Sequence, residues 1–336
     1  MQPATTPAEG TKPGERAGVA ALAAGARRRL QAATEGLGER ERELLDQAPL
    51  SWATGLLGHQ RQGSGLLGVS RALATIAGRV GAHGPDWQTR YAQLVVLALL
   101  SGLETRKPVI VIPASVWPHV EAGLQTVLAE AGAPGWGSDW TQELFEKDVA
   151  VALLQAIPFE GLAGTVERHR PWRLVRWASW KERVALASYL RTAFFRPSSY
   201  FNRHQWRGYR GGYRRPWQIL MLVNADVLAA NPTILGVFGT GWPFDPALSK
   251  VSPRLAERAE AFRTVGARPF RMRTNANSVE WALMASSTRR ELFEAGEYRP
   301  AKYGLIVHRR DLRRWAEAQD RASWDLSPLD PAAPVA

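Results

Sequence analysis

The feature that most constrains the fold of this chain is the complete absence of cysteine from its 336 residues. Without thiols it can form no disulfide bond, no cysteine-ligated zinc site and no iron–sulfur cluster, so an apolar core must hold the folded state. Hydrophobic residues make up 45% of the sequence, and the length suits one large domain or two. This composition is typical of a soluble globular protein and excludes one with several membrane spans.

The two ends of the chain differ from its middle. Residues 1–16 carry Pro or Gly at five positions and show no apolar period, which predicts a disordered lead-in and no signal peptide. The longest apolar run, Leu94 to Leu100, is too short to cross a bilayer. Residues 326–336 hold three prolines and predict a disordered tail. We therefore expect a cytoplasmic protein without a membrane partner.

Between these ends helical periodicity dominates, and short β-branched runs interrupt it. The predicted fold class is mainly α with short β (α+β), arranged as tandem winged-helix-like domains. Helices are expected at 17–45 (broken at Gly36 and Gly38), 64–80, 87–103, 116–130, 139–157, 180–195, 252–263, 286–295 and from 309 onwards. Strands are expected at 108–112, 218–223, 268–273 and 302–308.

The same pattern predicts the domain organisation. A helical N-terminal domain with a winged-helix-like unit is expected over 17–160, because a helix, the strand 108–112, a second helix and a Gly/Pro loop follow one another. A basic segment follows over 161–215, and a C-terminal winged-helix-like domain over 216–325. The main boundary is expected near 160–170.

The positive charge of the chain is concentrated in the basic segment. The whole sequence carries a net charge of +12, and residues 161–215 contain thirteen Lys and Arg against two acids, Glu167 and Glu182. Charge packed this densely repels itself unless a ligand such as a phosphate backbone supplies the counter-charge. The preference for Arg over Lys indicates bidentate contacts to phosphate or guanine. The segment therefore predicts a polyanionic partner.

The centre of this segment, Asn202 to Trp217, interleaves arginines with Trp and Tyr and contains three glycines that would act as flexible joints. Guanidinium groups neutralise phosphates, and aromatic faces accept bases. The alternative is a solvated loop whose aromatic residues pack on a neighbouring sheet. The residues predicted here to bind nucleic acid are Arg203, Trp206, Arg207, Tyr209, Arg210, Tyr213, Arg214 and Arg215.

The C-terminal region has the order of a known DNA-binding unit. A short helix from Ser286 to Ala295, a Gly-Glu turn, an extended stretch from Lys302 to His308 and a last helix beginning Arg-Arg-Asp-Leu follow one another. This order resembles the second half of the MerR/excisionase-like winged helix-turn-helix, over roughly residues 278–318. The resemblance implies that Arg289 and Arg290 face the DNA groove from a recognition helix and that Lys302 lies on the wing. The alternative is that both arginines pair with neighbouring glutamates on a solvated helix face.

Two such units around a basic centre are similar in layout to plasmid replication initiators that bind repeated origin sequences. This similarity implies a non-enzymatic, sequence-specific protein for double-stranded DNA, either an origin-binding initiator or a related regulator. DNA is the expected partner, self-association into a dimer is left open, and no cofactor is expected.

No arrangement of residues predicts a metal site or a catalytic residue. The six histidines are never closer than 24 residues in sequence, and none belongs to a metal-ligand motif. His204 and Arg207 match the His-x-x-Arg of tyrosine recombinases, with Tyr298 or Tyr303 as a conceivable nucleophile. A DNA recombinase or nuclease is therefore one alternative function, and RNA binding through the Arg/Gly/aromatic loop is another.

Overall fold

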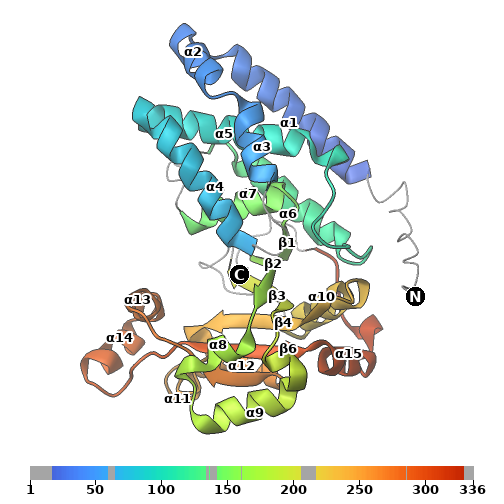
Figure 1. The fold of residues 1–336 in the computed structure, drawn as a ribbon, viewed down its shortest axis with the longest axis vertical. Coiled ribbons are helices and arrows are strands. Elements are labelled where there is room, and N and C mark those ends of the chain that lie inside the picture. The colour runs from blue at the N-terminus through green and yellow to red at the C-terminus, as the bar shows by residue number, and fades with distance from the viewer. Residues whose placement is uncertain are drawn as a thin grey trace.

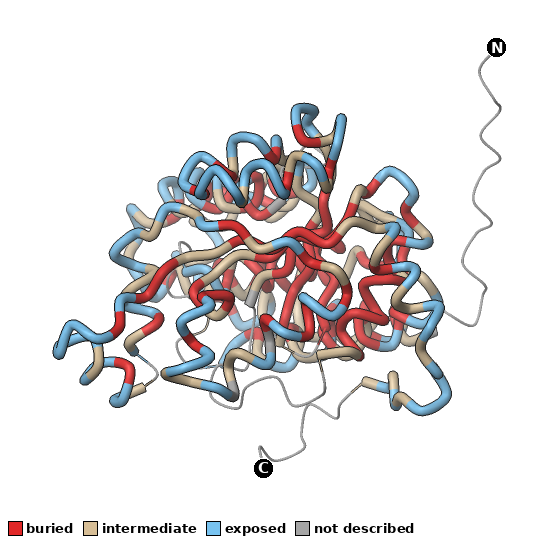
Figure 2. The backbone as a smooth tube through the Cα atoms, turned by 90° about the horizontal axis from the view of Figure 1, so that it is seen from below, coloured by how far each residue is buried: buried red, intermediate tan, exposed pale blue. Residues whose placement is uncertain are grey.

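The computed structural model describes residues 17–59, 65–133, 136, 142–159, 161–205, 217–284 and 286–328. Within these ranges the fold is mainly α with short β, as predicted, and its strands form a six-stranded sheet. A helical region occupies one end of the molecule and the sheet with its covering helices occupies the other (Figure 1). Buried residues of both regions belong to one continuous core. In the view from below, they gather in the interior of the molecule (Figure 2).

The helical region is built around a buried helix, α5 (Pro85–Ser101). Leu94, Val95, Leu97 and Leu99 of α5 are fully buried. Gly36 separates the first two helices as predicted, and a further helix over 50–58 follows them. The other helices of this region are α1 (Ala17–Glu35), α2 (Glu39–Gln47), α3 (Leu50–Gly58), α4 (Gly65–Val80), α6 (Trp117–Glu130) and α7 (Glu143–Ala152).

The sheet has the strand order β1-β2-β3-β4-β6-β5. Neighbouring strands are antiparallel except β3 and β4, which are parallel and are connected through the buried helix α10 (Trp217–Ala230). A parallel pair needs such a crossover. The strands are β1 (Ala156–Phe159), β2 (Leu162–His169), β3 (Ser198–Gln205), β4 (Ile234–Gly241), β5 (Arg268–Arg271) and β6 (Tyr303–His308).

Each face of the sheet packs against a different helical layer. Phe201, Val237 and Val307 belong to the large core, together with residues of α10, α12 (Pro253–Thr264) and α15 (Arg309–Glu317). Tyr200 and Phe238 on the opposite face belong to a second core that lies under α8 (Pro171–Leu174) and α9 (Trp180–Leu190). Alternate residues of a strand point to opposite faces, so β3 contributes to both cores.

The remaining helices of the C-terminal half form a smaller third cluster around Trp242 and Tyr298. They are α11 (Leu248–Val251), α13 (Ala276–Met284) and α14 (Ser287–Glu294), and the last two project from the body of the molecule (Figure 1). None of the helices in the described ranges combines the length and the hydropathy that a membrane crossing requires.

The prediction of a strand at 108–112 is wrong, because this segment is an irregular connection. Pro108 and Pro113 flank it and carry no N–H for a ladder. The side chain of Asn231 takes the place of a neighbouring strand: its Oδ1 accepts from the N–H of Val111 at 2.9 Å, and its Nδ2 donates to the carbonyl of Val111 at 2.7 Å. One side-chain amide thus bonds both backbone groups of Val111, and the N–H of Val109 donates to the carbonyl of Leu154 at 3.3 Å.

Two further expectations are corrected. Residues 218–223 lie in the helix α10, because an apolar run buried on all sides reads alike as a strand or as a helix. Residues 160–170 were expected to hold the domain boundary, yet β2 occupies 162–169 and pairs with both β1 and β3. Residues 161–205 of the basic segment, the part that the structure describes, therefore belong to the sheet and its cover.

The sheet does not contain the predicted wings. β6 confirms the extended stretch expected at 302–308, and α14 and α15 confirm the helices on either side of it. However, β6 lies between β4 and β5 in the six-stranded sheet, where it pairs with both. The expected tandem winged-helix architecture is therefore not seen in the part of the chain that the structure describes.

Candidate nucleic-acid interface

The cover of the second core presents a basic and aromatic outer surface. Pro171 begins α8, and Ser179 caps α9 in a capping box with Glu182. Val175, Ala178, Leu186 and Leu190 point inward and are buried against the sheet. The outward side chains gather with Arg273 of a neighbouring loop and with the two basic residues around His169 to form the basic aromatic surface. It consists of Arg168, Arg170, Trp172, Arg173, Arg176, Trp177, Trp180, Lys181 and Arg273.

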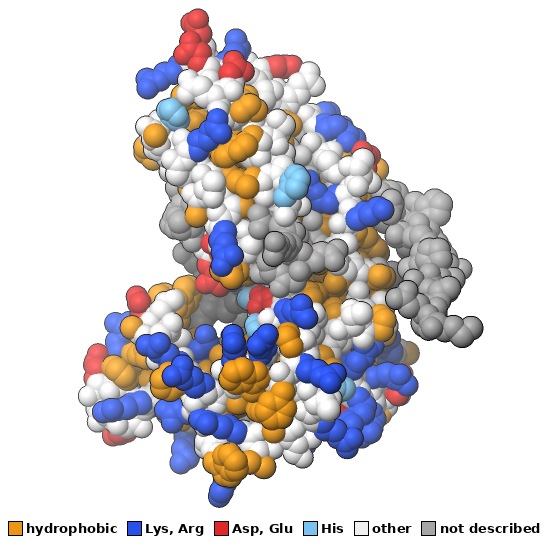
Figure 3. Space-filling view, viewed as in Figure 1, with side chains coloured by type: hydrophobic (Ala, Val, Ile, Leu, Met, Phe, Trp, Pro, Cys, Tyr) orange, Lys and Arg blue, Asp and Glu red, His pale blue; other side chains and the backbone are white. Residues whose placement is uncertain are grey.

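The exposure of the tryptophans in this surface is unusual. Trp172 is 42% exposed, Trp177 is 53% exposed and Trp180 is 77% exposed, although Trp normally buries most of its large apolar area. Lys and Arg side chains surround large hydrophobic ones over α8 and α9 (Figure 3). The guanidinium of Arg173 lies 5.2 Å from the ring of Trp172, and that of Arg273 lies 5.8 Å from the ring of Trp177. Flat rings beside cations are suited to stacked bases and phosphates.

The cations of this surface have no acidic partner in the described part of the chain. Glu182 is the only acid between residues 168 and 197. Its Oε2 accepts from the backbone N–H and the hydroxyl of Ser179, and its Oε1 accepts from the N–H of Arg271. This carboxylate is therefore committed to capping α9 and contacting β5. The surface keeps a positive potential that only a ligand can neutralise.

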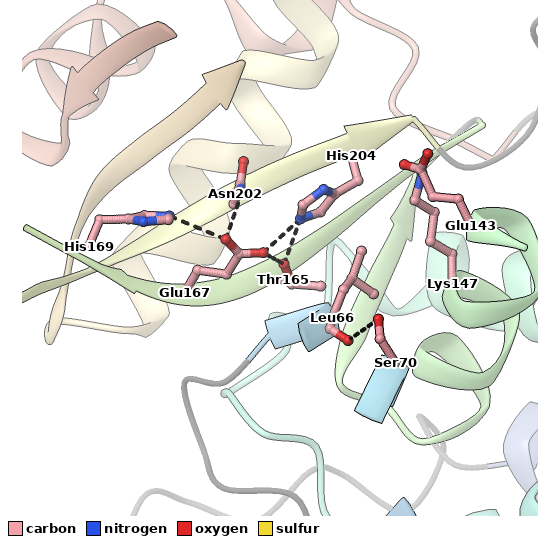
Figure 4. A network of polar contacts seen from close by, with 9 residues as sticks. All are labelled: Leu66, Ser70, Glu143, Lys147, Thr165, Glu167, His169, Asn202 and His204. Carbon is pink, nitrogen blue, oxygen red and sulfur yellow. Dashed lines mark hydrogen bonds and ion pairs between the residues drawn. The ribbon is translucent and has the colours of Figure 1, made fainter. Parts of the chain in front are cut away.

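Beside this surface, five polar side chains meet on one face of β2 and β3 (Figure 4). The Oε1 atom of Glu167 lies 2.9 Å from His204 Nε2 and accepts from Thr165 Oγ1 at 3.1 Å. Its Oε2 atom accepts from Asn202 Nδ2 at 2.9 Å and lies 3.2 Å from His169 Nε2. Residues two apart on each strand share a face, and the pairing of Thr165 with Asn202 brings the two strands into register. We call these residues the Glu167 cluster.

The carboxylate at the centre of this cluster is ionised. Burial alone would raise the pKa of Glu167, but the contacts from His169 and His204, together with that from Asn202, outweigh it and hold the pKa well below its usual range. His204 Nε2 is hydrogen-bonded to this carboxylate, whereas His169 Nε2 lies within ion-pair distance of it and makes no hydrogen bond with the described residues. Glu167 therefore links two histidines that belong to neighbouring strands.

The geometry of the cluster does not make a metal centre. Both imidazoles face the carboxylate instead of converging with it on one point (Figure 4). No group of three or more His, Asp or Glu residues in the described ranges is arranged to hold a metal ion. What the cluster can do chemically is to hold two imidazole rings in fixed positions beside a cationic surface.

Two of the arginines predicted to contact nucleic acid lie inside the protein, and this corrects the prediction for both. Arg203 is 7% exposed, and its Nε donates to Asn224 Oδ1 at 2.8 Å between β3 and α10. Arg289 is 4% exposed, and its Nε donates to the carbonyl of Ala282 at 2.7 Å. Arg289 also lies 4.8 Å from the ring of Trp242. Both guanidinium groups join elements of the fold and cannot reach a phosphate.

The other predicted residues have different outcomes. Arg290 is exposed on α14 and forms no ion pair with the described residues, so the alternative of pairing with neighbouring glutamates is not seen, and its contact with nucleic acid stays a prediction. Lys302 is half-buried just before β6, where its backbone continues the pairing with the end of β5. The remaining residues lie outside the described residues: Trp206, Arg207, Tyr209, Arg210, Tyr213, Arg214 and Arg215.

The sequence contained a signal for this surface that the prediction did not use. Trp172, Trp177 and Trp180 lie within nine residues of one another together with Arg173 and Arg176, a mixture of Trp and Arg like the one that drew attention to 202–217. The Glu167 cluster left a weaker signal, because polar residues spaced by two on each strand come together only once β2 and β3 pair.

Comparisons with family models, with curated proteins and with solved structures give no match for this chain.

Proposed function

We propose that this protein binds nucleic acid through the basic aromatic surface. The observation that carries the proposal is the combination of exposed tryptophans with cations that lack acidic partners in the described residues, on a helical layer fixed to the sheet by its own core. Phosphate contacts would supply most of the affinity, and the tryptophans would accept any unpaired base.

The narrower form of the proposal is a sequence-specific protein for duplex DNA, such as an origin-binding replication initiator or a related regulator. Its support is the net charge of +12 and the Arg-rich segment, of which β2, α8, α9 and β3 form the described part. Arg290 is an exposed residue of α14 that could add base readout, as the resemblance to a recognition helix implies. RNA binding is a competing outcome of the same experiment.

The test measures dissociation constants at several salt concentrations for duplex DNA, single-stranded DNA and RNA of one length. Replacing Arg170, Arg173 and Arg176 together with Gln should weaken binding and flatten the slope of log K against log salt. The slope should fall by about 0.9 for each duplex phosphate that is no longer neutralised, or by about 0.7 for each phosphate of a single strand. The matched control removes three exposed arginines of the helical region, Arg28, Arg40 and Arg71.

The control separates a local contact from an effect of total charge, because both triple variants lose three positive charges. Equal losses of affinity and slope in the two variants would contradict a specific surface over α8 and α9. Absence of binding by the wild-type protein to all three nucleic acids would overturn the proposed function itself. An unbiased selection of bound duplexes that yields one repeated motif would support the narrower form.

A further inference from the structure

A cleft of about 580 Å³ opens where β2 ends and α8 begins. Its lining comes from the last residues of β2, the start of the following helix and the residue before β3. These lining residues are Arg168, His169, Arg170, Arg173, Leu174 and Pro197. The cleft thus adjoins both the basic aromatic surface and the Glu167 cluster.

Three of the four polar residues that line the cleft are arginines. Arg168, Arg170 and Arg173 are exposed and have no acidic partner in the described part of the chain, and no acid lines the cleft. Charge-assisted hydrogen bonds from Arg are strongest to carboxylate and phosphate oxygens. Three guanidinium groups around one cleft therefore indicate an anion with more than one negative charge.

The fourth polar group of the lining is held in place from behind. His169 Nε2 lies 3.2 Å from Glu167 Oε2, and the imidazole packs edge-on against Phe238 with ring centroids 4.8 Å apart. The side chain is 19% exposed, so the ring is fixed but not sealed from solvent. The ring therefore forms a fixed and partly exposed wall of the cleft. A pre-organised wall of this kind favours a ligand of defined shape.

We propose that the cleft binds a nucleotide that carries a phosphate monoester, at the end of a nucleic-acid strand. A monoester carries about −1.5 to −2 charges at neutral pH, whereas a backbone diester carries about one, so three guanidinium groups suit the monoester better. A volume of about 580 Å³ exceeds that needed for a phosphate alone and falls in the range of small-ligand sites. Leu174 and Pro197 supply an apolar wall for the sugar or base.

This inference rests on the proposed function, because the strand would also contact the basic aromatic surface. The experiment compares the wild-type protein binding to one short single strand with a 5′-phosphate, a 3′-phosphate or only hydroxyl ends. Free mononucleotide and inorganic phosphate are measured separately. We expect one phosphorylated end to bind about tenfold more tightly than the hydroxyl form, as for one added charged contact. A preference for the free mononucleotide over every strand would assign the cleft to a free nucleotide and overturn strand-end recognition.

The variant Arg168→Gln/Arg170→Gln should reduce this ratio to near one, while the double control Arg28→Gln/Arg40→Gln should keep it. All four side chains are exposed, so the variants should fold, which their unfolding curves check. A wild-type ratio of one at both ends, with strands still bound, would overturn the inference and leave the proposed function intact. A ratio that survives in the cleft variant would also overturn it. Loss of all strand binding with retained mononucleotide binding would instead contradict the proposed function.

Discussion

Replacing Glu167 with Gln should destabilise the protein by about 3 kcal/mol at neutral pH. The carboxylate interacts with Thr165 and His204 through one oxygen and with Asn202 and His169 through the other. A glutamine of the same shape keeps one acceptor oxygen and turns an NH₂ group toward donors on the other side. About two charge-assisted hydrogen bonds are lost, each worth about 1.5–3 kcal/mol. Because the side chain is 19% exposed, water compensates in part and the lower end of this range applies.

The destabilisation should depend on pH in a defined direction. The pKa of Glu167 is lowered in the folded state, so the contribution of its ionised form is complete above the unfolded pKa of about 4.5 and is lost as the pH falls toward the folded value. Glutamine does not titrate. Each pH unit below about 4.5 should therefore remove up to about 1.4 kcal/mol from the difference between wild type and variant.

Urea unfolding followed by tryptophan fluorescence at pH 7 and at pH 4 or below measures both effects. Glu294→Gln is the matched control, because Glu294 is exposed on α14, and its free energy of unfolding should change by less than about 0.5 kcal/mol. A loss below about 1 kcal/mol for Glu167→Gln at pH 7, or a loss that does not shrink with falling pH, would refute the reasoning.

Two further predictions concern the sheet. Gly236→Ala should destabilise the protein by about 3 kcal/mol or more in urea unfolding, because the added Cβ would lie 2.0 Å from the carbonyl oxygen of Val307 on β6. The control is Gly55→Ala on α3, where the added Cβ would meet nothing within 4 Å and should stabilise the protein by about 0.5–1 kcal/mol. Similar losses of stability in both variants would contradict the argument. Tyr200→Phe should leave the free energy of unfolding unchanged or raise it, because the buried hydroxyl of Tyr200 has no hydrogen-bond partner among the described residues. Tyr91→Phe should lower the free energy of unfolding by about 1 kcal/mol, because the hydroxyl of Tyr91 donates to the carbonyl of Ala48. A clear loss of stability for Tyr200→Phe would show that its hydroxyl is hydrogen-bonded.

The sequence predicted the helices well and the sheet poorly, for a physical reason. Helices such as α5 and α6 repeat their apolar residues locally, so a short window contains the signal. β2 reads Leu-Ala-Gly-Thr-Val-Glu-Arg-His, with small residues at one end and charged residues at the other, and this does not alternate as a half-buried strand does. Its polar residues are stabilised by β3, which lies about 35 residues further on along the chain. No local window can contain such a partner.

The sequence analysis located the segment that carries the candidate surface but not the residues that form it. The density of Arg in 161–215 pointed to the region where α8 and α9 lie, and the described part of that region carries the basic aromatic surface. The prediction then favoured individual arginines by their neighbours in sequence. Arg203 follows Phe201 by two residues on a strand, so it shares the inner face of the sheet and is buried with it. The direction of a side chain depends on the strand register, which the sequence did not reveal.

Arginine has two separate uses in this chain, and only one of them supplies charge to a partner. Arg29 from α1 donates to carbonyls at the end of α6, Arg106 donates to the carbonyl of the last residue of α7, and Arg309 donates to carbonyls at the end of α10. Each cation stabilises the negative end of a helix dipole and satisfies carbonyls that the helix itself leaves free. These guanidinium groups are counted in the net charge of +12 but are already engaged. The basic aromatic surface differs from these sites, because most of its cations contact neither a carbonyl nor a carboxylate in the described part of the chain. An anion bound there would gain interactions without displacing any that the fold needs.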